Sequence, residues 1–189
     1  WPILIALLFG LAVIGERAYS LLNSSSNTDQ FFEDVKTAYD DSGKEQAIEL
    51  CENTPGPVAS IFYAGLSKMG NAKEEIEKAV QNAGGLEMAF LEKNMIWINS
   101  VITIAPMLGF TGTVVGMIKA FEDIKMANDI SPAVVAGGIS QALLTTAFGL
   151  IVAMIMQVAQ NFFVSMIDKL ILDMEEQSIK IVEYLHSSK

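Results

Sequence analysis

Three long stretches of this sequence contain no ionisable side chain, and their lengths limit what the chain can fold into. They are residues 1–15, 94–118 and 130–167. A helix needs about 20 apolar residues to cross a bilayer core of about 30 Å, so the second and third stretches can each span a membrane. The first is shorter, but Leu21 and Leu22 extend its apolar pattern beyond Glu16 and Arg17. We therefore expect three transmembrane helices.

Composition excludes several other classes of protein. A chain that is 51% hydrophobic, with a mean hydropathy of +0.39, is too apolar for an ordinary soluble domain. The net charge of −10 argues against nucleic-acid binding, which needs a basic face. Cys51 is the single cysteine and His186 the single histidine, so we expect no internal disulfide, no metal site and no cofactor.

The fold class that we expect is an all-α integral membrane protein, whose second and third spans are long and continue into a helical cytoplasmic domain. A cleaved signal peptide fits the start poorly, and because Trp1 is not an initiator methionine we expect residues ahead of it. The expected segments are transmembrane helices at 1–22, 94–118 and 132–167, a cytoplasmic helical domain at 23–93, a periplasmic loop at 119–131 and a cytoplasmic C-terminal helix at 168–189.

Orientation follows from the distribution of basic residues. Ten of the twelve Lys and Arg side chains fall in 16–93 or in the C-terminal tail, and two fall in the short loop. Because basic residues favour the cytoplasmic side, we expect a periplasmic N-terminus and a cytoplasmic C-terminus.

Local signals predict the helix boundaries. Apolar spacing predicts helices at 30–39, 44–51 and 58–69. Asn71 is the expected N-cap of the next helix, which shows no turn signal before residue 94 and is expected to run on into the second span. Ser131 followed by Pro132 is a typical start for the third span.

Small and polar residues interrupt the two later spans. In the second span, Ala105, Gly109, Gly112 and Gly116 recur at steps that allow another backbone to approach closely, and Pro106 is expected to kink the helix. In the third span one helical face, with Gln141 and Thr145 at its edges, is small or polar over many turns; its residues are Gly138, Ala142, Thr146, Gly149, Ala153, Gln157 and Gln160.

Two interpretations of this face remain open. Small residues with Ser and Thr are ordinary helix-packing features, whereas bulky amides facing lipid are costly, which favours a hydrated seam. Hydroxyls and amides do not change protonation state near neutral pH. If protons cross here, the titrating group must therefore come from another polypeptide, and an intramembrane carboxylate is the natural candidate.

The segments APMLGFTGTVVGMIKAF and GISQALLTTAFGLIVA resemble the two signature helices of the MotA/TolQ/ExbB proton channel family. WPILIALLFGLAVIGER and PGPVASIFYAGL resemble its ExbB/TolQ branch, so the likeness covers nearly the whole chain. Thr113 matches the family's threonine that faces a partner aspartate, and Thr146 matches the corresponding threonine of the third span. Gln141 departs from the pattern, because many members carry glutamate there, and Ile155 replaces a frequent proline.

The resemblance implies a pentameric homo-oligomer in the lipid of the bacterial inner membrane. Such a ring encloses a single-span ExbD/TolR-like partner with a membrane aspartate, and a TonB/TolA-like protein is a further expected partner. Proton motive force is then coupled to mechanical work on outer-membrane processes. The site residues are Thr113, Thr146, Thr145 and Gln141 along the proton pathway, with Pro106, Gly109, Gly112, Gly116 and Gly149 in helix packing and the kink.

Other functions remain as alternatives. A membrane scaffold would use the small residues only for packing, and a flagellar or gliding stator subunit is the alternative within the family. A solute transporter is disfavoured because no inverted repeat or pair of broken helices appears. An enzyme is disfavoured because no nucleophile–base or metal constellation appears.

Overall fold

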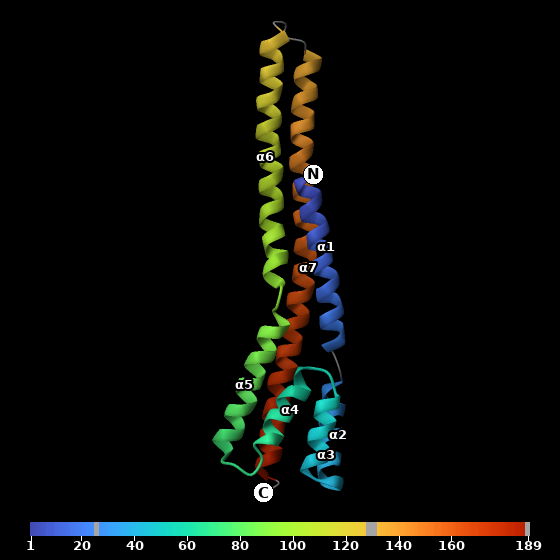
Figure 1. Ribbon diagram of the computed structural model, residues 1–189, viewed down its shortest axis with the longest axis vertical. Helices are drawn as coiled ribbons and strands as arrows, with labels where there is room; N and C mark the ends of the chain where they lie inside the picture. Colours follow the sequence, from blue (N-terminus) through green and yellow to red (C-terminus); the bar gives the residue numbers. More distant parts are fainter. Residues whose placement is uncertain (25–26, 128–131, 188–189) are drawn as a thin grey trace. The chain divides into compact units, whose positions relative to one another are not determined.

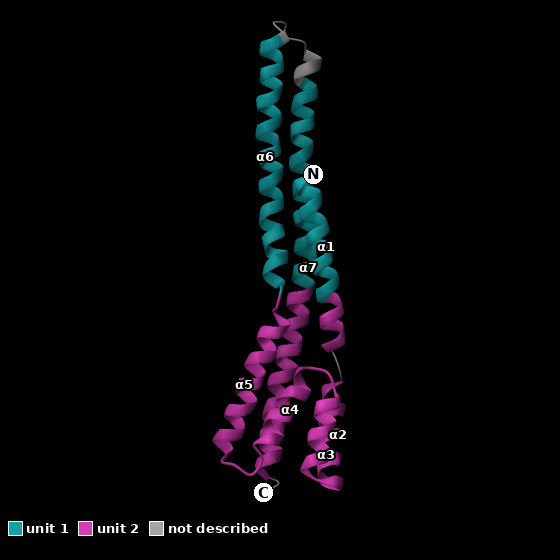
Figure 2. Cartoon of the chain, in the orientation of Figure 1, with its two compact units in different colours: residues 1–17, 94–162 teal, residues 18–93, 163–189 magenta. Residues whose placement is uncertain are grey.

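In the computed structural model, which describes residues 1–24, 27–127 and 132–187, all regular secondary structure is helical. The helices are α1 (Pro2–Ser24), α2 (Thr28–Ser42), α3 (Lys44–Asn53), α4 (Pro57–Ser67), α5 (Lys73–Leu91), α6 (Met95–Ala127) and α7 (Pro132–Ser187) (Figure 1). They form two compact units, one of residues 1–17 and 94–162 and the other of residues 18–93 and 163–189 (Figure 2).

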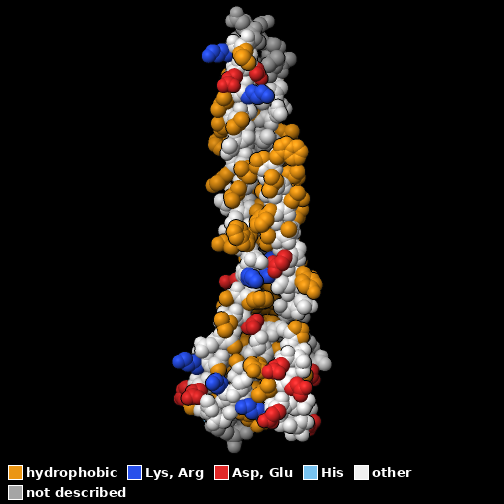
Figure 3. All heavy atoms as spheres, in the orientation of Figure 1, with side chains coloured by type: hydrophobic (Ala, Val, Ile, Leu, Met, Phe, Trp, Pro, Cys, Tyr) orange, Lys and Arg blue, Asp and Glu red, His pale blue; other side chains and the backbone are white. Residues whose placement is uncertain are grey.

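The first unit holds apolar stretches of α1, α6 and α7, each long enough to cross a membrane. In their most apolar windows only 11%, 17% and 22% of the residues are buried within the chain. Figure 3 shows hydrophobic side chains gathered over much of this unit, with a few charged side chains at its upper end, whereas Asp, Glu, Lys and Arg are interspersed over the second. So much outward apolar surface requires lipid or protein around it, and the expected all-α membrane fold with three spanning helices is confirmed.

Helix α1 lies against both other helices of the first unit. A Cβ atom on Gly10 would fall 2.6 Å from Met156 Sδ and 3.5 Å from Val101 Cγ1, so a larger residue at this position would displace the Met156 side chain. The rings of Phe9 and Trp97 meet edge to face with centroids 6.0 Å apart. These contacts hold α1 against α6 and α7, although its uncharged stretch is the shortest of the three.

Helix α6 extends beyond the expected span at its C-terminal end. The segment 119–131, expected as a loop, is helical as far as Ala127, and residues 128–131 lie outside the described residues. The physical reason is that this stretch contains good helix formers without Gly or Pro, and Lys125 in the last turn is favourable to the helix dipole. The helix also passes through Pro106, where the expected kink stays a prediction.

Helix α7 is a single element of 56 residues that contributes to both units. It joins the expected third span and the expected C-terminal helix without a break. At 1.5 Å per residue it is about 84 Å long, which exceeds any bilayer, so part of it lies outside lipid. It begins at Pro132, and the expected cap Ser131 lies outside the described residues.

The expectation that one helix runs from the polar domain into the second span is wrong. Helix α5 ends at Leu91, residues 92–94 form a turn, and α6 begins at Met95. Asn94 has a positive φ of 65°, a left-handed conformation that asparagine tolerates better than most residues. Its side-chain amide donates to Glu16 Oε2 at 3.2 Å, which ties the start of α6 to α1 within the first unit.

Aromatic side chains form the centre of the second unit, where α2 to α5 and the end of α7 pack together. The rings of Phe31 and Phe62 stack with centroids 5.6 Å apart, and Tyr184 meets Phe32 and Tyr39 edge to face. Other side chains are buried around them: Val35, Ala47, Cys51, Ile61, Leu66, Ile181 and Leu185. The unit therefore has a hydrophobic core of its own.

A polar cluster joins α2 to α7 in the second unit. Asp29 accepts from Lys180 Nζ and from Gln177 Nε2, both at 2.8 Å, and Gln177 is almost fully buried. Hydrogen bonds from Lys180 and then Gln177 lower the pKa of Asp29, and those from Lys180 to Asp29 and Glu176 raise the pKa of Lys180. This cluster holds the first turn of α2 against α7.

The expected N-cap of α5 is displaced by one residue. Ala72 occupies the N-cap position without a side-chain hydrogen bond. Asn71 instead donates from Nδ2 to Glu75 Oε2 at 2.6 Å, because its side chain reaches the carboxylate one turn into the helix. The acidic residues Glu74 and Glu75 in that turn are favourable to the helix dipole, as the sequence indicates.

Cys51 gives a direct test of packing in the second unit. The thiol is buried in α3, and burial raises its pKa to about 12. Relative to the ordinary value of 9.0, this lowers the reactive thiolate fraction at pH 8 by about a thousandfold. We expect maleimide to label the folded protein about a hundredfold more slowly than the denatured protein. Mass spectrometry measures the labelling rate. Equal labelling rates would contradict the packing of α3.

Candidate functional site

The candidate site lies where α6 packs against α7 in the first unit. Glycines on both helices set the distance of approach. A Cβ on Gly109 would lie 3.0 Å from the Thr145 carbonyl oxygen, and one on Gly149 would lie 2.5 Å from the Ala105 carbonyl oxygen. Because backbone atoms are the obstacles, no side-chain rotation could relieve these clashes.

The same close approach continues toward the N-terminal end of α7. A Cβ on Gly116 would lie 2.8 Å from Ala142 Cβ, and one on Gly138 would lie 2.5 Å from Ala120 Cβ. One on Gly112 would lie 2.6 Å from Thr145 Oγ1. The small face of the third span therefore packs on the small face of the second, as helix association in lipid favours.

Three threonine hydroxyls converge at this contact. Thr113 Oγ1 contacts Thr146 Oγ1 directly, and it lies 3.3 Å from the Gly109 carbonyl and 3.1 Å from the Ala142 carbonyl. Thr146 Oγ1 donates to the Gly109 carbonyl at 3.0 Å. Thr145 Oγ1 donates to the Ala142 carbonyl at 2.7 Å and lies 3.3 Å from the Gly109 carbonyl.

The chemistry of this cluster is that of a neutral network with more than one proton arrangement. A hydroxyl has one proton and two lone pairs. If Thr146 donates to the Gly109 carbonyl, Thr113 can donate to Thr146; if Thr113 donates to the Ala142 carbonyl, Thr146 can donate to Thr113. In either arrangement a hydroxyl oxygen keeps a lone pair, and all three threonines are only half-buried. The lone pair lets the cluster accept from a group that approaches it, and a hydroxyl that rotates away from its present acceptor can donate to such a group.

Other hydroxyls of α6 differ from this cluster. Thr103 and Thr111 are exposed and donate to the backbone carbonyls of Asn99 and Met107, four residues before them. Such bonds satisfy a hydroxyl within its own helix and need no second helix. Cross-helix bonding therefore distinguishes the Thr113 cluster from Thr103 and Thr111.

Part of the α7 face that was expected to border a hydrated seam is packed against α6 in the structure. Between residues 138 and 149 the small face of α7 is covered by α6 of the same chain, and the hydroxyls there support packing. Farther along α7, Gln157 is exposed and donates from Nε2 to Asn161 Oδ1 at 2.9 Å, while Gln160 Oε1 is buried without a hydrogen-bond partner. The polar amides therefore lie beyond the tightest packing.

The structure brings together three of the four residues expected along the proton pathway. Thr113, Thr145 and Thr146 come together, whereas Gln141 lies exposed one turn before Thr145. The carbonyls of Gly109 and Ala142, which the hydroxyls share as acceptors, carry no signal in the sequence. Asn161 does carry one, because its spacing of four residues from Gln157 places both on one helix face.

Comparison with known proteins agrees with these motifs. Residues 53–176 match the MotA/TolQ/ExbB proton channel family. The ExbB-like protein 3 of Synechocystis sp., named as a biopolymer transport protein, is 29% identical over 167 residues, which cover 87% of this chain and 80% of that protein.

Two further relatives match this chain over a smaller share of their own length. An ExbB homologue of Methanothermobacter thermautotrophicus is 28% identical over 162 residues, covering 85% of this chain and 57% of that protein. The Tol-Pal system protein TolQ of Pseudomonas aeruginosa is 28% identical over 117 residues, covering 56% of this chain and 51% of TolQ. The chain thus spans little more than half the length of these two relatives.

The matched region contains α6, most of α7 and the threonine cluster. The apolar helices make the chain a membrane protein, and relatives of both the ExbB and the TolQ type share its sequence. The chain therefore belongs to the MotA/TolQ/ExbB proton channel family, in the ExbB/TolQ branch, and has that family's role in energy transduction.

Proposed function

We propose that this chain is the channel subunit of an inner-membrane motor that couples proton motive force to work on outer-membrane processes. It forms a ring, a pentamer as in the family, around a single-span ExbD/TolR-like partner with a membrane aspartate. Its N-terminus is periplasmic and its C-terminus cytoplasmic. A TonB/TolA-like protein would transmit the work. These partners and this stoichiometry are those of the family to which the chain belongs.

The observation that carries the proposal is the threonine cluster across α6 and α7. Thr113 and Thr146 contact each other in a stretch without any ionisable side chain, and both remain half-buried. A carboxylate brought to this place would accept from a hydroxyl that rotates away from its carbonyl, and a carboxylic acid would find hydroxyl and carbonyl acceptors. The ring would supply the lining and the partner the titrating group.

Magnitudes support this division of roles. A hydrogen bond to a charged group contributes about 1.5–3 kcal/mol. A proton crossing the membrane potential releases about 2.3 kcal/mol per 100 mV. These energies are comparable, so neutralising the partner's carboxylate can weaken its contact with the threonines enough to let the partner turn or shift.

The departures from the family pattern strengthen the need for a partner. Gln141 retains hydrogen-bonding groups but cannot carry a proton as glutamate does. Within residues 94–118 and 132–167 the chain has no acid of its own. A scaffold role remains the alternative, because the same threonines also bond the two helices together.

Proton flux in proteoliposomes tests the proposal. We expect the purified chain alone to conduct poorly, and addition of a single-span partner with its membrane aspartate to raise flux by about tenfold or more, because an intramembrane carboxylate is the carrier. A pH-sensitive dye inside the vesicles measures the rate, and a partner with Asp replaced by Asn is the control. Full-rate conduction by the chain alone would refute the proposal.

A further inference from the structure

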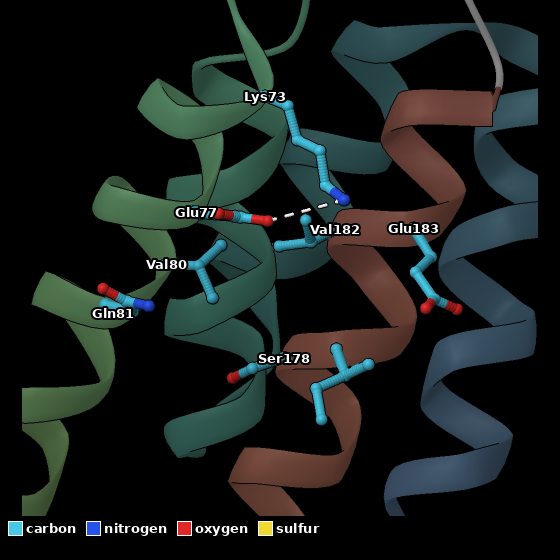
Figure 4. Close-up of a pocket in the computed structure, with 8 residues that line it drawn as sticks. Lys73, Glu77, Val80, Gln81, Ser178, Val182 and Glu183 are labelled. Atoms are coloured by element: carbon cyan, nitrogen blue, oxygen red, sulfur yellow. Dashed lines mark ion pairs between the residues drawn. The ribbon is translucent and has the colours of Figure 1, made fainter.

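A groove runs along the second unit between α5 and the C-terminal part of α7. One stretch of about 410 Å³ is lined mainly by apolar side chains, with Ile61 of α4, Met88 and Met174 among them. A second stretch of about 200 Å³ shares Val80 and Ile179 with the first, so the two are continuous. In Figure 4, Val80, Gln81, Ser178 and Val182 line the second stretch.

A glycine pair in α5 opens the first stretch. A Cβ on Gly84 would meet Ile61 Cδ1 at 3.9 Å, an ordinary contact, and a Cβ on Gly85 would meet nothing within 4 Å. Glycine inside a helix costs about 0.5–1 kcal/mol relative to alanine. Packing within the chain does not explain why residue 85 is glycine, because a Cβ atom there would meet no other part of the chain within 4 Å. Close approach of another molecule would explain it.

The apolar lining reaches the surface of the charged unit. Ile179 is 62% exposed and Met88 is 37% exposed, and both line the groove. Methionine adapts to varied apolar surfaces and is common where peptides dock. Apolar side chains from a partner could therefore bury against the floor of this groove.

The rim of the groove is acidic. Glu175 lies on the first stretch, and Glu77 and Glu183 on the second, where Lys73 pairs with Glu77 at 3.6 Å (Figure 4). The residues of the second unit include eighteen Asp and Glu against nine Lys and Arg. An occupant with Lys or Arg beside its apolar residues would complement this charge.

We propose that this groove binds an amphipathic segment of a partner protein, apolar on one side and flanked by Lys or Arg. The apolar side lies over Gly84 and Gly85 between α5 and α7, and the basic side chains reach the rim carboxylates. This inference concerns a different part of the chain from the threonine cluster, and it does not rest on proton conduction.

The test uses the full chain in nanodiscs of phosphatidylcholine and a fluorescein-labelled peptide of about four helical turns. Leucine recurs every third or fourth position of the peptide and lysine fills the others. Anisotropy measures binding, and empty nanodiscs correct for lipid adsorption. We expect this peptide to bind about tenfold more tightly than its counterpart with glutamate in place of lysine, because the rim is acidic.

Variants locate the binding. Gly85→Leu is expected to weaken binding about tenfold by filling the groove, whereas Ala89→Leu, an exposed position of the same helix outside the groove, should stay within about twofold. Glu175→Lys with Glu183→Lys is expected to weaken binding about tenfold at low salt and to flatten its salt dependence. The same charge change at Glu45 and Glu49 of α3 is the control.

Three results would overturn the proposal. The first is equal binding by the groove variants and the parent chain. The second is an equal loss in the groove and control variants, which would show that overall charge alone attracts the peptide. The third is a change in oligomer size on Gly85→Leu in native mass spectrometry without loss of peptide binding, which would assign the groove to a second copy of this chain.

Discussion

Thr146→Val is expected to reduce coupled proton flux by about tenfold to a hundredfold while leaving the fold and the oligomer intact. Valine is nearly isosteric with threonine but has no hydroxyl, so the donor to the Gly109 carbonyl and the contact with Thr113 Oγ1 are lost. Losing a hydrogen bond to a charged carboxylate costs about 1.5–3 kcal/mol, which sets the size of the effect. Flux with the partner present, and native mass of the complex, are the two measurements.

Matched variants separate conduction from packing. Thr146→Ser keeps the hydroxyl and is expected to keep most of the flux. Thr111→Val removes a hydroxyl that, among the described residues, bonds to the Met107 carbonyl of its own helix, and it should leave flux unchanged. Normal energy-dependent function in Thr146→Val would favour the scaffold interpretation of the cluster.

Gly149→Ala is expected to destabilise the protein by about 1–3 kcal/mol, the usual cost of overpacking. The new Cβ would lie 2.5 Å from the Ala105 carbonyl oxygen and 3.2 Å from Gly109 Cα, so α6 and α7 must separate. Separation would also pull the three threonine hydroxyls away from their shared carbonyls. Thermal unfolding in detergent, followed by circular dichroism, measures the loss.

The control for this variant lies on the same helix. A Cβ on Gly137 would meet nothing within 4 Å, so Gly137→Ala should be neutral or stabilising by about 0.5–1 kcal/mol through helix propensity. The two substitutions add the same methyl group, but only Gly149→Ala is expected to destabilise the protein. A Gly149→Ala protein that melts at or above the parent temperature would contradict the close approach of α6 and α7.

Several features of this protein could be predicted from local sequence. The lengths of the uncharged stretches predict three apolar helices, because the cost of burying charge in lipid acts on each segment separately. Turn residues predict most boundaries in the second unit: Gly43, with φ of 87°, separates α2 from α3, and Gly56 precedes the proline that starts α4. These choices depend on near neighbours in the chain.

Other boundaries were decided by contacts between distant residues. The turn at Asn94 carries no glycine or proline, and the asparagine is held by Glu16, which lies 78 residues away. The extension of α6 to Ala127 shows the reverse case, in which charged residues that mark the end of an apolar span do not end the helix.

By itself, then, the sequence determined that the chain is a helical membrane protein whose later spans lack any acid, because segment length, hydropathy and charge are local properties. Only the tertiary structure decided that Thr113 and Thr146 face each other while Gln141 lies exposed, and that Gly84 and Gly85 open a groove. Hydroxyl contacts are short-range, so they form only when the two helices have the right register along their axes and the right distance between them. That separation is set by backbone-to-backbone clashes at Gly109 and Gly149, which no single segment encodes alone.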